Sequence, residues 1–248
     1  MTLDLYLFRH GESELNVKDI GNEATIGGRS PHINLSERGI QQAKALGHEL
    51  KRRGTSFDYL YSSPTVRAEH TAKIVAGAIG FPADKILTSE ALHEVSNGSW
   101  EGKLKKEVYT PEVIAQINAN NWQFIPPNGE SQQQVANRMY DFIYQNFIEK
   151  KDLSSNISVG LATHGTSMKD LRALILFREI MGVDENLVRN AIRSTIENCA
   201  IAQFKYIPQN QKMSGWHEIS WNDHAHLYEC GFQKEGYYSG RKLIKISA

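Results

Sequence analysis

Residues 4–16 read DLYLFRHGESELN, an apolar run that ends in an arginine and a histidine. A short apolar run of this kind, over residues 3–8, is typical of a buried strand. Arg9 and His10 follow at its carboxyl end. Because an arginine and a histidine are costly to bury together without an anion, this junction indicates a site for a negatively charged group.

A second stretch, VGLATHGTSMKDL at residues 159–171, also contains an apolar run that is followed by a histidine and a glycine. A strand is expected over residues 156–163, and His164 and Gly165 come directly after it. In open α/β sheets, ligands bind outside the carboxyl ends of the strands. If the two strands are neighbours, both His–Gly pairs face one crevice.

Helices alternate with short apolar strands along the rest of the chain. Ser36 is expected to cap a helix that ends at Gly54. Ser63 is expected to cap a second helix, which begins at Pro64 and ends at Gly80. The other expected elements are strands at 57–63, 198–207 and 216–221, and helices at 111–121, 131–150 and 166–177. This alternation predicts an α/β sheet covered on both faces.

The predicted crevice is suited to phosphate. Arg67 lies one turn into the helix that follows the strand at 57–63, so it is expected near Arg9, His10 and His164. Two guanidinium groups offer planar pairs of donors that match phosphate oxygens.

Backbone groups are expected to contribute as well. Helix N-termini near Ser13 and Thr166 offer N–H groups and a positive dipole end, and Gly11 and Gly165 would let an anion approach the backbone. Neither GxxxxGK[ST] nor GxGxxG occurs in the chain, so this would be a phosphate site without a Walker loop.

The composition excludes several classes of protein. The chain has 28 Lys and Arg residues and 28 Asp and Glu residues, which argues against a nucleic-acid binder or a polybasic membrane binder. The apolar stretch at 173–177 is far too short to span a bilayer, and the first strand begins too early for a signal peptide. We therefore expect a cytoplasmic protein with one domain over residues 1–248, because no segment resembles a linker.

Metal and cofactor binding are not expected. The two cysteines, Cys199 and Cys230, lie outside any CxxC or Cys/His ligand pattern, which argues against zinc and against a disulfide framework. Asp223, His224 and His226 could bind a metal, but their HxH pair is as easily an exposed turn.

Six segments occur along the chain in this order: FRHGESELN, LSERGIQQA, SSPTVRAEHTA, LHEVSNGSWEG, GES at 129–131 and THGTS. Together they resemble the signatures of the histidine phosphatase superfamily, in its phosphoglycerate-mutase-like branch. The resemblance spans residues 3–170, and WNDHAHL at 221–227 is similar to a late segment of the family. It implies a three-layer α/β/α sandwich around a mainly parallel sheet.

The resemblance also implies roles for individual residues. His10 would be the nucleophile that takes the phosphoryl group on a ring nitrogen, and Glu94 would be the general acid and base. Arg9, Arg67 and His164 would hold the phosphoryl oxygens. The matching serine and asparagine near the phosphate are Ser13 and Asn16.

The chemistry of these residue types agrees with those roles. A nucleophilic imidazole must be neutral, and Arg9 and Arg67 would lower the pKa of His10. The leaving alcohol needs a proton, which Glu94 could hold beside a bound phosphate dianion. Without the resemblance, Glu94 would be interpreted as an exposed loop carboxylate.

The predicted function is hydrolysis of a phosphomonoester, on a small phosphorylated metabolite or a phosphorylated protein, through phosphohistidine and without a metal. The alternatives are a phosphoglycerate-type mutase and a non-catalytic module that binds a phosphorylated ligand. The mutases of this family carry extra arginines and lysines after the WEG signature. In this chain Lys103, Lys105 and Lys106 lie close together after that signature, but the stretch that follows them to Asn128 contains no arginine. Specificity is expected to come from residues 17–34 and 103–130.

Overall fold

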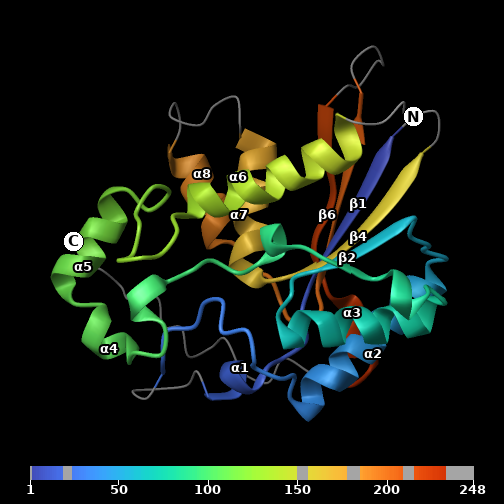
Figure 1. The fold of residues 1–248 in the computed structure, drawn as a ribbon, viewed down its shortest axis with the longest axis horizontal. Coiled ribbons are helices and arrows are strands. Elements are labelled where there is room, and N and C mark those ends of the chain that lie inside the picture. Colours follow the sequence, from blue (N-terminus) through green and yellow to red (C-terminus); the bar gives the residue numbers. More distant parts are fainter. Residues whose placement is uncertain (1, 19–23, 150–155, 178–184, 209–214, 233–248) are drawn as a thin grey trace.

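The computed structural model describes residues 2–18, 24–149, 156–177, 185–208 and 215–232 (Figure 1). Its sheet has six strands in the order β3-β2-β4-β1-β5-β6. The strands are β1 (Leu3–Arg9), β2 (Tyr59–Ser62), β3 (Leu87–Thr88), β4 (Ile157–Thr163), β5 (Ile201–Ile207) and β6 (Gly215–Asp223). The first four pair in parallel, whereas β5 and β6 pair antiparallel. The sheet is therefore mainly parallel, as the resemblance implied.

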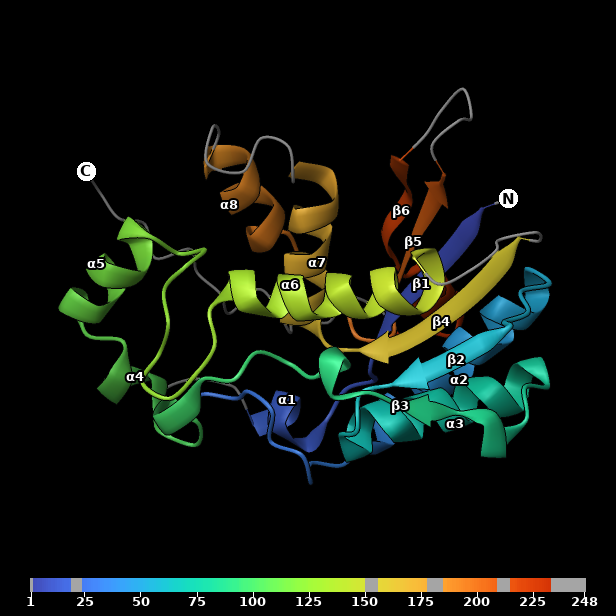
Figure 2. The same ribbon diagram turned by 45° about the horizontal axis from the view of Figure 1, so that its top comes forward.

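Helices cover both faces of this sheet (Figures 1 and 2). One face carries α2 (Glu37–Arg52), α3 (Val66–Ile79) and α9 (Ala225–Glu229), and the other carries α6 (Gln132–Ile143), α7 (Gly165–Phe177) and α8 (Glu185–Arg193). Each face has its own hydrophobic core, one containing Leu46 and Leu60 and the other Leu161 and Met139. The three-layer α/β/α sandwich is thus confirmed.

The register of β1 and β4 places the two His–Gly junctions side by side. Arg9 is paired with Thr163, and the N–H of His10 donates to the carbonyl of Thr163 at 3.0 Å. His10 and His164 therefore leave neighbouring parallel strands at the same level, and the condition that the two strands are neighbours is met.

One of the two predicted helix caps is confirmed. Ser36 caps α2 by accepting from the N–H of Gly39, and Ser131 forms a capping box at α6. The prediction for Ser63 is wrong: the N-cap of α3 is Thr65, and α3 begins two residues later than expected, after Pro64. The Ser63 hydroxyl instead contacts the Nε2 of His164 at 2.8 Å, so this hydroxyl belongs to the site and does not cap the helix.

The last strands also differ from expectation. The strand predicted at 198–207 begins at Ile201, because Cys199 adopts a left-handed backbone with a φ of 57°. The short strand β3 and helices α8 and α9 were not predicted. Within the described part of the chain, no helix is long and apolar enough to cross a membrane.

The two segments expected to set specificity pair with each other. Residues 24–26 run against residues 102–105, with the N–H of Ile26 donating to the carbonyl of Lys103 at 2.8 Å. Two short helices follow, α4 (Lys105–Val108) and α5 (Pro111–Ala119). Figure 2 shows them on the side toward which β2 and β4 point, and α1 (Glu14–Lys18) follows β1 nearby. Residues 19–23 of the first segment lie outside the described residues.

Candidate active site

His10 is a buried imidazole with a defined tautomer. Its Nδ1 lies 2.7 Å from the carbonyl of Gly11 and therefore carries the hydrogen, while Nε2 accepts from the Nε of Arg67 at 3.2 Å. Burial lowers the pKa of His10 well below its ordinary value, and the charges of Arg67 and Arg9 lower it further. The sequence predicted the effect of the two arginines, whereas burial proves to be the larger cause. His10 is thus neutral, with a lone pair on Nε2.

Arg67 is a buried guanidinium whose described partners are all neutral. It donates to His10, to the Nδ1 of His164 at 3.2 Å, and to three backbone carbonyls, those of Gly28, Arg29 and Ser30. No carboxylate of the described residues lies within ion-pair distance. Burial is the main reason that the pKa of Arg67 falls to about 10, so the group keeps its charge at neutral pH and leaves the site with excess positive charge.

His164 stands beside His10 with its ring centroid 5.1 Å away. Its Nδ1 accepts from Arg67, so Nε2 carries the hydrogen and donates to Ser63. Burial, followed by the charge of Arg67, lowers the pKa of His164 well below its ordinary value. The site therefore holds two neutral imidazoles, one on each side of a charged guanidinium.

Arg9 lies against the start of α7. Its Nη1 donates to the carbonyl of Ile196 at 2.8 Å. A Cβ atom on Gly165 would lie 3.2 Å from the Arg9 Nε, so glycine lets the guanidinium pass close to the helix N-terminus. Gly11 has a different role from the one expected: a side chain there would collide with the carbonyl of Gly39 in α2, so its lack of a side chain serves packing.

Ser13 and Asn16 form a small network with a residue that the sequence did not indicate. The Asn16 Oδ1 accepts from the backbone N–H and the hydroxyl of Ser13, each at 3.1 Å. Asn198 approaches the same oxygen at 3.4 Å and also donates to the carbonyl of His10 at 3.0 Å. The turn before β5, which displaced the predicted strand start, is thus the element that brings Asn198 to the site.

Glu94 reaches the site from the loop after β3 and binds the first turn of α7. Its carboxylate accepts from the N–H groups of Thr166 and Ser167 at 3.1 and 3.0 Å, and from the Ser167 hydroxyl at 3.0 Å. The N–H of Thr166, expected to face phosphate, therefore has Glu94 as its partner here. Glu94 is only partly buried, and an acceptor at a helix N-terminus is a stabilising arrangement.

The three residues at 223–226 that could have formed a metal site each have a different partner. Asp223 pairs with Arg53 at 2.8 Å, His224 bonds within its own turn, and His226 is buried against the carbonyl of Cys199. Within the described ranges, no group of three or more His, Cys, Asp or Glu residues could hold a metal ion. Independence from metals and cofactors stays a prediction.

The fold and the site together define an α/β protein with a buried histidine–arginine cluster at the carboxyl edge of its sheet. The chain belongs to the histidine phosphatase superfamily, branch 1, whose family model matches residues 5–219. The superfamily contains phosphatases and mutases, so the chain is a member of a class of enzymes.

Two relatives illustrate the sequence similarity. A 2,3-bisphosphoglycerate-dependent phosphoglycerate mutase of Methylobacterium radiotolerans is 33% identical over 174 residues, which is 69% of this chain and 77% of the mutase. A phosphoglycerate mutase of Schizosaccharomyces pombe is 35% identical over 188 residues, 75% of this chain and 83% of that protein.

Solved structures show the same fold. Bacillus stearothermophilus YhfR aligns with a TM-score of 0.69 at 26% identity, over 91% of this chain and 99% of that one. A mycobacterial glucosyl-3-phosphoglycerate phosphatase aligns with a TM-score of 0.67 at 21% identity, over 90% of this chain and 100% of that chain.

Asp170 is a buried carboxyl group behind the site. It lies in α7, none of its surface is exposed, and neither carboxyl oxygen has a hydrogen-bond partner among the described residues. Burial raises the pKa of Asp170 well above its ordinary value. The charged groups that act on it are Lys169 and Arg138, which lower this pKa, and Glu94 and Glu130, which raise it. An unpartnered buried carboxylate is costly, so Asp170 holds a proton in the folded state.

Asp170→Asn is therefore expected to become more stable than the wild type as the pH rises. The raised folded-state pKa means that wild-type stability is fully present below the unfolded value, about pH 4, and is lost as the pH rises toward the folded value. The difference in unfolding free energy should grow by up to about 1.4 kcal/mol per pH unit in favour of the variant. Urea unfolding at several pH values measures it, with exposed Asp141→Asn as the control, and a constant difference would contradict a protonated Asp170.

Proposed function

We propose that this protein hydrolyses phosphomonoesters through a phosphohistidine on His10. The observation that carries the proposal is the contact between two buried groups, a neutral His10 with its Nε2 lone pair and a charged Arg67 with neutral partners. Such a pocket attracts an anion, and a phosphate oxygen is a better acceptor for Arg67 than an imidazole or a carbonyl. When phosphate takes that donor, the Nε2 lone pair becomes available for attack.

The reaction then has two steps. The Nε2 of His10 attacks phosphorus, the ester P–O bond breaks, and Glu94 gives a proton to the leaving oxygen. In the second step Glu94 takes a proton from water, the resulting hydroxide attacks phosphorus, and the P–N bond breaks to release phosphate and neutral His10. Positioning and charge stabilisation carry most phosphoryl-transfer catalysis, and Arg9, Arg67 and His164 are the groups proposed to supply them.

A mutase is the second candidate, because two relatives that are 33% and 35% identical to this chain are named phosphoglycerate mutases. A mutase must keep phosphohistidine from water and hold the other acidic group of its substrate. The segment from Lys103 to Asn128 has no arginine, and its last basic residue is Lys106. We therefore expect water to reach the phosphohistidine and hydrolysis to dominate. The third alternative, a pure binding module, would have no need of a neutral nucleophile and a proton donor.

The expected result is release of inorganic phosphate in the presence of EDTA, with isomerisation of 3-phosphoglycerate absent or much slower. A phosphate-release assay on a panel of phosphorylated metabolites and phosphopeptides should be run beside a coupled mutase assay, with and without 2,3-bisphosphoglycerate. Mutase turnover well above phosphate release would establish the second candidate. Activity lost in EDTA and restored by a divalent metal would contradict the metal-free mechanism.

A further inference from the structure

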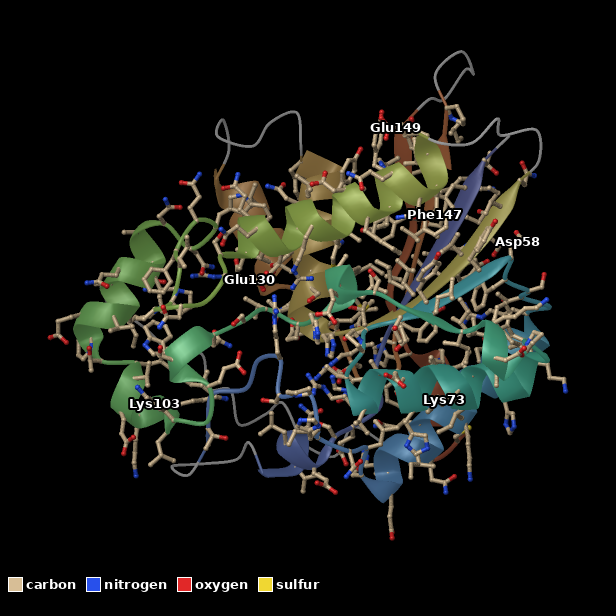
Figure 3. The ribbon with its side chains drawn as sticks, viewed as in Figure 1. Asp58, Lys73, Lys103, Glu130, Phe147 and Glu149 are labelled. Carbon is tan, nitrogen blue, oxygen red and sulfur yellow. The ribbon has the colours of Figure 1, made fainter. Side chains whose placement is uncertain are left out.

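Glu130, the glutamate of the GES segment, has no part in the chemistry above, yet it joins three elements of the site. Its Oε1 lies 3.1 Å from the Nε of Arg138 in α6 and 3.1 Å from an Nη of Arg29. Its Oε2 accepts from the backbone N–H of Ser96 at 3.1 Å. Figure 3 shows Glu130 near the start of α6. One carboxylate thus binds two guanidinium groups and the loop that contains Glu94.

Arg138 connects Glu130 to the loop that contains the general acid, Glu94. Its guanidinium donates to the carbonyls of Ala91, His93 and Glu94 at 2.6, 2.8 and 3.1 Å. A guanidinium is rigid and planar, so its orientation sets the positions of all three carbonyls. Glu130 holds that orientation from the side of Nε.

Arg29 connects Glu130 to Arg67, which is proposed to bind phosphate. Its own backbone carbonyl accepts from Arg67 at 3.2 Å, between the carbonyls of Gly28 and Ser30, which do the same. The side chain of Arg29 binds Glu130. The loop that positions Arg67 is therefore tied, through one carboxylate, to the loop that positions Glu94.

Glu130 is ionised in this network. Burial by itself would raise the pKa of Glu130, but the hydrogen bond and charge of Arg138, the N–H of Ser96 and the charge of Arg29 outweigh burial and lower that pKa. The side chains of Glu130 and Arg138 are each 19% exposed, so water only partly screens their interaction, whereas Arg29 is 39% exposed and its interaction with Glu130 is screened more strongly.

We propose that Glu130 is a positioning residue for Glu94, which sets the location of the general acid relative to the phosphate held by His10 and Arg67. The proposal rests on the proposed function. Proton transfer requires hydrogen-bond reach to the leaving oxygen, and a displacement of about 1 Å can cost on the order of 100-fold in rate. Glutamine at this position keeps the shape but loses the negative charge, and its NH₂ group cannot accept the bonds that Ser96 and Arg138 donate to Oε2.

The test is the dependence of Glu130→Gln on the leaving group. An alkyl ester such as 2-hydroxyethyl phosphate needs the proton from Glu94, whereas p-nitrophenyl phosphate does not. We expect kcat/KM to fall roughly 10- to 100-fold on the alkyl ester and less than about threefold on the p-nitrophenyl ester. Arg29→Gln removes only the ion pair between Arg29 and Glu130 and should show a smaller change of the same kind. If Glu130→Gln does not fold, this variant tests the proposal in its place.

Glu218→Gln is the matched control. Glu218 is also an ion-paired glutamate, bound to Arg172 and 23% exposed, but it lies in the edge strand β6. This control should leave both activities near wild type. Equal losses on the two esters in Glu130→Gln, or no loss on either, would overturn the proposal. Failure of the proposed function would look different, because the wild type would then release phosphate from neither ester.

Discussion

His10→Ala is expected to abolish turnover, with a loss on the order of 10⁴-fold or more because the variant lacks the nucleophile. Rapid quench of the wild type in alkaline detergent after mixing with labelled substrate should reveal a phosphoprotein that is stable in base and loses its label in acid, which the variant should lack. Because burial, Arg67 and Arg9 lower the pKa of His10, the imidazole stays neutral as the pH falls. The acid limb of kcat/KM should therefore lie below the ordinary imidazole value of 6.5.

His48→Ala is the control for this experiment, since His48 is an exposed histidine in α2. It should keep both the label and the turnover. A fully active His10→Ala variant would refute the mechanism. Binding of the phosphorylated ligand to the wild type with neither label, phosphate release nor mutase turnover would instead favour the non-catalytic binding module.

Glu94→Gln is expected to slow the hydrolysis of alkyl phosphates by roughly 10²–10⁴-fold, the usual worth of general acid catalysis. The p-nitrophenyl ester should lose much less, because p-nitrophenolate leaves without a proton. Steady-state kinetics on the two esters measure the difference. The variant should also melt at a lower temperature, since the amide cannot accept all of the bonds that Thr166 and Ser167 now donate.

Glu229→Gln is the matched control for Glu94, because Glu229 is an exposed glutamate in α9, outside the segments expected to set specificity. It should leave both rates unchanged. An equal loss on both esters in Glu94→Gln would move Glu94 from proton donation to substrate binding or to the support of α7.

Local pattern predicted much of the fold. The apolar runs before Arg9 and His164 were long enough to identify two buried strands, and parallel strands present their carboxyl ends at one edge. That reasoning brought the two histidines together, and the register of β1 and β4 confirms that their strands are neighbours. The cap at Ser36 was predicted, because a cap depends only on neighbours within one helical turn. The capping box at Ser131 is equally local, although it was not predicted.

Hydrogen bonds between residues far apart in the sequence could be identified only from the tertiary structure. Ser63 binds His164, 101 residues away, and Asn198 binds the carbonyl of His10, 188 residues away. No local periodicity encodes such partners, because a side chain's hydrogen bond depends on which distant segment the fold places beside it. For the same reason the larger cause of the lowered His10 pKa, its burial, appears only when the layers close over the sheet edge. The attachment of Glu94 to Glu130 through Arg138 likewise exists only after α6 has packed beside that loop.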